Sequence, residues 1–201
     1  MVGTKTDRRA RAEHLFRVVS SDRFLQKQGL GNEVPFFICA FDAEDGLSLG
    51  EDREDLIARL SHAGVRVLDI DLYDLSIRIL EDRGIFEQIL EVEAETEKAE
   101  LKELLQGVLD PQAHLIPEIA RRIEEVPHDV IFLSGVGEVY PYLRPHNVLN
   151  NLQSVVTGKP MLMFFPGRYE QSDTLGSSLV LFGRLKDDQY YRAKNILEQE
   201  A

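Results

Sequence analysis

The stretch Val34-Pro-Phe-Phe-Ile-Cys-Ala-Phe41 decides the fold class, because it is apolar almost throughout. A strand that faces water on one side alternates apolar and polar residues, whereas a continuous apolar run of this length suits a strand covered on both faces. Such strands belong to parallel sheets, whose crossover connections place helices on either side. The run therefore predicts a strand inside an α/β domain.

Apolar stretches further along the chain alternate with helical patterns. We expect additional strands at 65–73, 128–134, 159–165 and 178–182, with the strand at 159–165 stopped by Pro166-Gly167. We expect helices at 8–28, 51–62, 75–105 with an interruption near Gly84, 111–125, 145–156 and 187–200. This alternation predicts a three-layer α/β sandwich with a mainly parallel sheet of about five strands. Since no repeat, linker or low-complexity tract divides the chain, residues 1–201 are expected to form one domain.

Composition excludes several classes of protein. The hydrophobic fraction of 43% and the charged fraction of 29% are ordinary for a globular protein. No apolar run approaches the ~20 residues that cross a bilayer, and the charged stretch 1–17 lacks the apolar segment of a secretory signal. A cytoplasmic location without a membrane partner is therefore expected.

Net charge and cysteine content narrow the choice further. Non-specific DNA binding depends on Lys and Arg that neutralise phosphates, so a net charge of −12 makes direct DNA binding by the isolated protein unexpected. The single cysteine, Cys39, excludes an intramolecular disulfide and a cysteine metal cluster. Its place inside an apolar run favours a buried thiol over a nucleophile.

Ligands of open α/β sheets usually bind beyond the carboxyl ends of the strands. The first such segment is Asp42-Ala-Glu-Asp-Gly-Leu-Ser-Leu-Gly50. It lacks the lysine of a phosphate-binding loop, and its three carboxylates would repel a nucleotide. This composition excludes an ordinary P-loop ATPase.

Two aspartates in the second expected strand suggest either a cation site or an ordinary strand end. Asp69 and Asp71 lie two residues apart and so share a face. With Asp42, Asp45 or Asp74 they could hold a hard cation such as Mg²⁺. In the alternative interpretation they are solvated acids at a strand end, or they cap the following helix. A metal-dependent hydrolase or nuclease, using Asp42, Asp69 and Asp71 with Arg144 or His146, is accordingly the second functional hypothesis.

The segment that follows the third expected strand contains small residues. Gly135-Val-Gly137 matches only half of a dinucleotide fingerprint, because Tyr140 occupies the position of the third glycine. A tight strand-to-loop turn explains these glycines better. Ser134 has no G-x-S-x-G context that would mark a nucleophile. We therefore assign no catalytic residue and no cofactor.

The loop from Glu138 to Asn147 is the first candidate for a binding surface, since it combines aromatic, basic and amide side chains between two prolines. Loops carry binding residues more often than cores, and Tyr and Arg are favoured at binding hot spots. The candidate partner-binding residues are Tyr140, Tyr142, Arg144, His146, Asn147, Asn151, Arg168, Tyr190, Tyr191 and Arg192.

Two other interpretations of these residues stay open. The prolines could simply shape the loop while the polar groups satisfy the backbone and cap a helix. A third functional hypothesis, a sensor of nucleotides or nucleic acids, requires Arg144, Arg168, Arg184 and Arg192 to converge into one basic patch.

Several long blocks resemble the BrxB family, which is encoded in BREX phage-exclusion loci. The blocks are Gly29-Leu-Gly-Asn-Glu-Val-Pro-Phe-Phe-Ile38, Phe132-Leu-Ser-Gly-Val-Gly-Glu-Val-Tyr-Pro-Tyr-Leu-Arg144, Asn147-Val-Leu-Asn-Asn-Leu152, Phe164-Phe-Pro-Gly-Arg-Tyr169 and Tyr190-Tyr-Arg192. They extend from the first expected strand to the C-terminal segment.

This resemblance implies a role in bacterial defence against phage. BREX systems combine a DNA methyltransferase, a large ATPase, a PglZ alkaline-phosphatase-like protein and small accessory proteins. Membership would make the chain a non-catalytic accessory or adaptor component, with a PglZ-like protein as its foremost partner among the BREX proteins. The layout is also loosely similar to that of P-loop NTPases, and the absent phosphate loop would make any such relationship a degenerate one.

Overall fold

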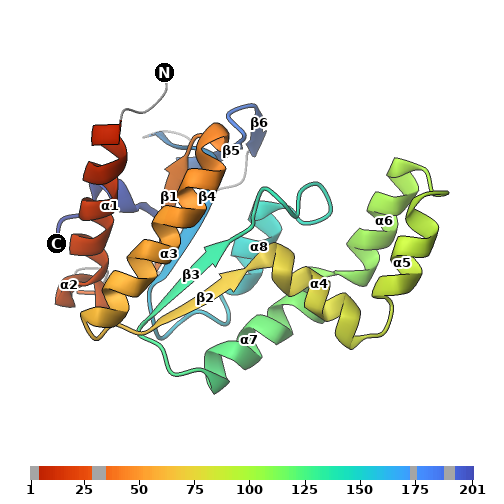
Figure 1. Ribbon diagram of the computed structural model, residues 1–201, viewed down its shortest axis with the longest axis horizontal. Helices are drawn as coiled ribbons and strands as arrows, with labels where there is room; N and C mark the ends of the chain where they lie inside the picture. The colour runs from red at the N-terminus through yellow and green to blue at the C-terminus, as the bar shows by residue number, and fades with distance from the viewer. Residues whose placement is uncertain (1–4, 29–34, 173–175, 188–192) are drawn as a thin grey trace.

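The computed structural model describes residues 5–28, 35–172, 176–187 and 193–201. Its centre is a parallel sheet with helices on both faces (Figure 1). The parallel strands follow the order β2-β3-β4-β1-β7. Their bounds are β1 Phe36–Phe41, β2 Val67–Asp71, β3 Val130–Ser134, β4 Met161–Ser172 and β7 Lys194–Asn195. The α/β sandwich predicted from the sequence is confirmed.

Alternate residues of the strands face two separate hydrophobic cores. Phe36, Ile38 and Ile131 lie in one core, and Phe37 and Phe132 in the other. The register explains this division, because the parallel pairing of β1 and β3 with β4 brings residues of the same face side by side. Strands with two buried faces cannot show the polar alternation of a half-exposed sheet, which is why the sequence of β1 is continuously apolar.

Different helices cover the two faces. Buried residues of α1 Lys5–Val19, α2 Asp22–Leu25 and α3 Gly46–His62 belong to the second core. Those of α4 Leu72–Asp82, α7 Ile116–Glu125 and α8 Pro145–Leu152 belong to the first. The other two α-helices, α5 Phe86–Glu93 and α6 Lys98–Val108, form an arm that projects from the sheet (Figure 1), and a short π-helix, Pro111–Leu115, leads into α7. Within the described residues, no helix combines the length and apolar character needed to cross a membrane.

The end of β4 differs from the prediction. The strand continues past Pro166-Gly167 and pairs antiparallel with β5 Gly176–Leu181, which in turn pairs with β6 Leu185–Asp187. Gly167 permits this change of partner: its φ is +152°, and a Cβ there would lie 2.1 Å from the carbonyl oxygen of Val180. The glycine therefore allows close approach of β5, so the expected strand end at this position was wrong.

Several predicted helices also differ. The stretch 8–28 divides into α1 and α2, and the hydroxyl of Ser21 caps α2 by accepting from the Phe24 amide at 3.3 Å. The stretch 75–105 forms parts of α4, α5 and α6. The first break falls near Gly84, as predicted, where φ is +67°, whereas the second break, between α5 and α6, was not predicted. Helix α3 begins at Gly46 instead of residue 51, and α8 ends at Leu152 instead of residue 156.

The expected helix 187–200 was wrong for the described part of that stretch. β7 pairs with β1 at the sheet edge, and a short 3-10 helix, Ile196–Glu198, follows it. The side chain of Asn195 accepts from the Leu197 amide at 3.1 Å and so begins that turn. Edge pairing and this cap together replace the helix.

Candidate functional site

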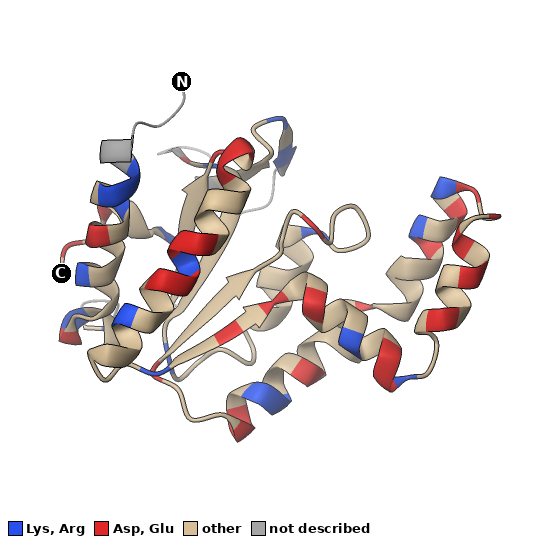
Figure 2. Cartoon of the chain, viewed as in Figure 1, with Lys and Arg blue, Asp and Glu red and all other residues tan. Residues whose placement is uncertain are grey.

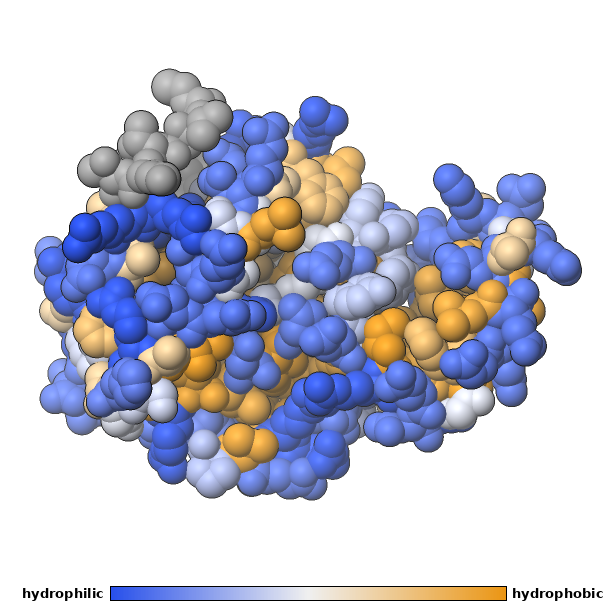
Figure 3. Space-filling model, viewed as in Figure 1, coloured by the Kyte–Doolittle hydropathy of each residue, from blue (hydrophilic) through white to orange (hydrophobic). Residues whose placement is uncertain are grey.

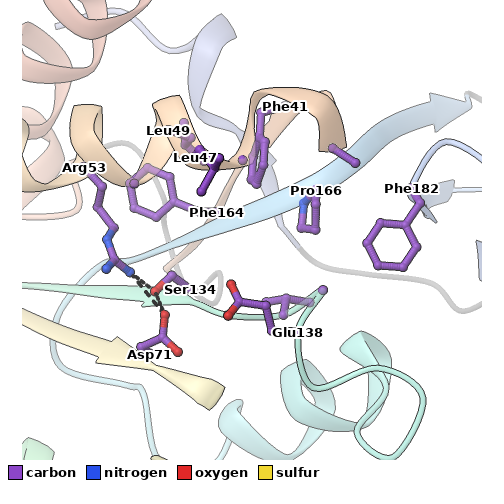
Figure 4. Close-up of a pocket in the computed structure, with 16 residues that line it drawn as sticks. Phe41, Leu47, Leu49, Arg53, Asp71, Ser134, Glu138, Phe164, Pro166 and Phe182 are labelled. Atoms are coloured by element: carbon purple, nitrogen blue, oxygen red, sulfur yellow. Dashed lines mark hydrogen bonds and ion pairs between the residues drawn. The ribbon is translucent and has the colours of Figure 1, made fainter. Parts of the chain in front are cut away.

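A pocket of about 510 Å³ opens at the carboxyl ends of β1, β2 and β3 and beside Phe164 and Pro166 of β4, where the parallel pairing of β4 with β1 ends (Figure 4). This is the edge at which open α/β sheets usually bind ligands, and the volume lies within the range of small-ligand sites. Its walls are mostly apolar, formed by the side chains of Phe41, Leu49, Phe164, Pro166 and Phe182. The pocket therefore lies between three strand ends, the middle of β4 and the first turns of α3.

One wall of the pocket carries an unusual backbone conformation. Phe182, in the turn between β5 and β6, has a φ of +54° and is 38% exposed at the rim. The left-handed region is unfavourable for a bulky side chain, by about 1–2 kcal/mol. Outliers of this kind cluster at binding and active sites. Leu47, on the first turn of α3, is 94% exposed at the same rim. The rim thus presents two large apolar side chains to solvent.

A paired polar cluster closes one side of the pocket. The guanidinium of Arg53, from α3, donates to the hydroxyl of Ser134 and lies 3.6 Å from a carboxylate oxygen of both Asp69 and Asp71. Ser134 donates in turn to Asp71 at 2.9 Å. The Nε of Arg53 is buried without a hydrogen-bond partner among the described residues. Figure 4 shows Arg53, Ser134 and Asp71 meeting across the ends of β2 and β3.

The acids of β2 have structural partners. The Oδ1 of Asp71 accepts from the backbone amides of Tyr73 at 2.9 Å and Asp74 at 3.2 Å, which caps α4. Of the alternatives left open for these acids, capping of the following helix is confirmed for Asp71. Partial burial raises the pKa of Asp69, and the positive charge of Arg53 opposes that shift. In the described part of the chain, no three His, Cys, Asp or Glu side chains are grouped to hold a metal. Arg53 occupies the position between Asp69 and Asp71 that a bridging cation would need.

The small residues after β3 make the tight turn that the sequence predicted. Gly135 has a φ of +74°, and a Cβ there would lie 2.5 Å from Asp71 Oδ1 and 2.9 Å from the amide nitrogens of Leu72 and Tyr73. A Cβ at Gly137 would lie 2.9 Å from atoms of Phe182 and Pro166. Both glycines thus permit close packing against the neighbouring strand ends.

The segment between β1 and α3 connects a strand to a helix, the position at which P-loop proteins carry their phosphate-binding loop. It forms a 3-10 turn, Ala43–Asp45, and carries carboxylates where a lysine would face a phosphate. A neighbouring hollow of about 670 Å³ is lined by Asp42, Glu44 and Arg184 as well as Phe182. Two acids and one arginine therefore line this hollow among the described residues.

The predicted binding loop runs from the end of β3 to α8 beside the pocket. Tyr140 packs edge-on against Phe182, with ring centroids 6.2 Å apart. Arg168 is exposed and donates to the carbonyl of Gly183 at 3.2 Å, in the same turn. Burial raises the pKa of Tyr142 to about 12, with smaller contributions from Tyr73 and Glu138. Tyr140 and Arg168, 28 residues apart in sequence, are therefore brought to one turn.

Other candidate residues are placed differently. Arg144 and Asn147 are exposed, at the start of α8, and His146 is half-buried between them. Asn151 donates to the carbonyl of Asn147 at 2.7 Å, a contact within its own helix, so the alternative that polar groups of this segment satisfy the backbone holds for Asn151. Tyr190, Tyr191 and Arg192 lie outside the described residues. Arg168 lies 3.6 Å from Glu170 and, through its bond to Gly183, at the same turn as Arg184. With Arg192 outside the described residues, convergence of the four arginines into one basic patch stays a prediction.

Comparison with known proteins identifies the family. Residues 68–196 match the family described as BREX protein BrxB. A BREX protein BrxB of Bacillus cereus (strain H3081.97) is 31% identical over 193 residues, which cover 94% of this chain and 97% of the relative. Another, from Escherichia coli O9:H4 (strain HS), is 30% identical over 179 residues, with 89% and 86% covered. No solved structure gives a significant match. The chain therefore belongs to the BrxB family and is an accessory component of the BREX phage-defence system.

Proposed function

We propose that this chain is a non-catalytic, cytoplasmic adaptor that binds a PglZ-like protein within the BREX complex. The observation that carries the proposal is the mutual pairing of Arg53, Ser134 and Asp71 at the carboxyl edge of the sheet. An enzyme could present such side chains to a substrate. Here they bind one another, hold the ends of β2 and β3 together and cap the start of α4. Membership of the BrxB family supports a role inside the same complex.

The proposed contact surface comprises residues 140–151, which are the loop after β3 and most of α8, together with Arg168 and residues 190–192. Its described part combines apolar and basic groups next to an apolar rim, a composition favoured where proteins bind one another. Tyr140 and Tyr142 pack against the first core, so their truncation would also lower stability. Arg144 is exposed and makes the cleaner test.

We would express the tagged chain beside each other BREX component and measure what is purified with it. We expect stoichiometric capture of the PglZ-like protein, and we expect Arg144→Glu to weaken that capture by about tenfold or more, because a central Arg contact is worth on the order of 2 kcal/mol. Arg78→Glu, an exposed arginine on α4, is the matched control. Failure of every component to co-purify at moderate salt would contradict the adaptor function, whereas equal capture by both variants would contradict only the surface.

A further inference from the structure

Glu138 is the polar residue of the pocket that the paired cluster does not use. It follows the Gly135–Gly137 turn and lines the pocket. Among the described residues, its carboxylate has no hydrogen-bond or ion-pair partner, although its backbone amide donates to Gly135 at 3.1 Å. Figure 4 shows the carboxylate directed into the pocket, towards Ser134 and Asp71. An unpaired acid in a partly enclosed apolar site is available to a ligand.

The charge balance of the pocket favours a cation. Arg53 is the positive group of the polar cluster, while Asp69, Asp71 and Glu138 are negative. Partial burial raises the pKa of Glu138, the negative charges of Asp71 and Asp74 add to this shift, and Arg53 opposes it. Glu138 is exposed at the mouth of the pocket, so its carboxylate can be reached from solvent. A positive group that reached it would offset the effects of burial and of the neighbouring acids, and perturbed acids of this kind are typical of binding sites.

The apolar walls define the remainder of the ligand. Phe164, Leu49 and Pro166 flank the space above Glu138, and Phe182 stands at its rim (Figure 4). An alkyl stem could pack against these side chains while a charged head reaches the carboxylate. Long basic side chains have this two-part character. Of the two, arginine is less strongly hydrated and matches a carboxylate with two parallel donors.

We propose that the pocket receives an arginine side chain of a partner protein, with its guanidinium on Glu138 and its alkyl stem between Phe164 and Phe182. The proposal deepens the adaptor function and rests on it for the source of the arginine. The pocket adjoins the Tyr140–Asn151 surface, because Tyr140 packs against Phe182 at the pocket rim, but none of the residues from Tyr140 to Asn151 lines the pocket. One inserted side chain of this kind is a typical interface anchor.

The test titrates the full chain with N-acetyl-arginine methylamide and records the backbone amide resonances of Gly135 and Gly137 by NMR. We expect a saturable shift at millimolar concentrations. The lysine analogue should bind more weakly, and the neutral norleucine analogue should leave both resonances unchanged. Absence of any saturable shift by the arginine compound, or equal shifts by arginine and norleucine compounds, would overturn the proposal.

Substitution of Glu138 tests whether its carboxylate binds the arginine compound. We expect Glu138→Gln to weaken binding of the arginine compound at least tenfold, because it removes a charge-assisted contact. Glu124→Gln, an exposed acid on α7, is the matched control and should bind like the parent chain. Thermal melting should show that Glu138→Gln is at least as stable as the parent, because the lost carboxylate is repelled by Asp71 and Asp74. Unchanged binding by Glu138→Gln would exclude the proposed contact.

Co-purification of the PglZ-like protein distinguishes the arginine pocket from the adaptor function. If the PglZ-like protein is captured equally by the parent chain and by Glu138→Gln, the anchor is wrong while the adaptor function stands. If the arginine compound binds through Glu138 but no BREX component is captured, the pocket assignment stands and the adaptor function fails.

Discussion

Gly135 and Gly84 have similar backbone angles in very different surroundings. Their φ values are +74° and +67°, but a Cβ at Gly84 would meet nothing within 4 Å, whereas one at Gly135 would strike the cap of α4. We expect Gly84→Ala to lower the free energy of unfolding by about 1 kcal/mol through backbone strain alone. Gly135→Ala should cost about 3 kcal/mol or more, because steric conflict at a close approach is added.

Urea denaturation of both variants measures this difference. Each variant is the control for the other, because both place alanine at a positive φ and only the space around the new Cβ differs. Equal losses of stability would show that the contact between the turn and Asp71 contributes little.

Glu118 should link stability to acid pH. It accepts from Arg121 at 2.7 Å and from Arg122 at 3.0 Å, and its hydrogen bond with Arg121 is the main cause that lowers its pKa from 4.5 to about 2. A lowered pKa means that the ionised acid is favoured in the folded state. Its contribution is therefore complete above pH 4.5 and is lost as the pH falls towards 2.

The matching variant is Glu118→Gln. We expect it to reduce the free energy of unfolding by about 0.5–1 kcal/mol at pH 7, the range of exposed ion pairs. Near pH 2 the variant and the parent chain should differ little. A pH-independent difference in denaturation midpoints would contradict the assigned role of the charge.

In the candidate site, the sequence predicted the roles of residues that stand at the end of a strand. Asp71 and Gly135 were recognisable because each stands where a strand ends, and the structure gives both a structural role there. Arg53 was missed, because its partners Asp71 and Ser134 come from distant parts of the chain and its own neighbours are acids that suggest a solvated helix. Phe182 was missed because an aromatic residue gives no sequence signal for a positive φ.

The α5–α6 arm differs from the other long helices because none of its residues is buried. Its exposed large apolar side chains are Leu90, Val92 and Leu104, and Figure 3 shows hydrophobic surface over this part of the molecule. Phe86, Ile89, Leu105 and Val108 pack against the first core but stay partly exposed. An element without fully buried residues is expected to open locally at a lower free energy than the central strands. We expect amides of α5 and α6 to exchange with deuterium at least about 100-fold faster than those of β3.

Hydrogen exchange followed by mass spectrometry of fragments from 86–93, 98–108 and 130–134 would measure this. The strand fragment is the internal control, because every residue of β3 is buried. Protection of the arm equal to that of β3 would show that its contacts with the first core are as stable as the central sheet.

The elements that were predicted correctly are those whose pattern is local. β1 and β3 are apolar throughout because both faces are covered, and that feature is visible in the sequence. The continuation of β4 depends on a backbone approach at Gly167, and β7 depends on pairing with β1. Such tertiary contacts decide between strand, turn and helix where local propensity does not.

Acidic residues are spread over the molecule and are frequent on the α5–α6 arm and on α3 (Figure 2). Electrostatic repulsion by a net charge of −12 should oppose approach to a phosphate backbone. We expect the isolated chain at about 10 µM to give no mobility shift of a 30-base-pair duplex at 150 mM salt. A salt-sensitive shift would instead reveal a basic surface outside the described contacts.

Cys39 has a practical consequence for the whole molecule. It is the single cysteine, it is fully buried in β1, and burial raises the pKa of its thiol to about 12. The native chain should therefore remain almost unlabelled by maleimide reagents at neutral pH. One cysteine introduced at Leu47 or Arg144 would then be the only reactive thiol. Fluorophores or cross-linkers attached at these two positions could report separately which side of the molecule a partner covers.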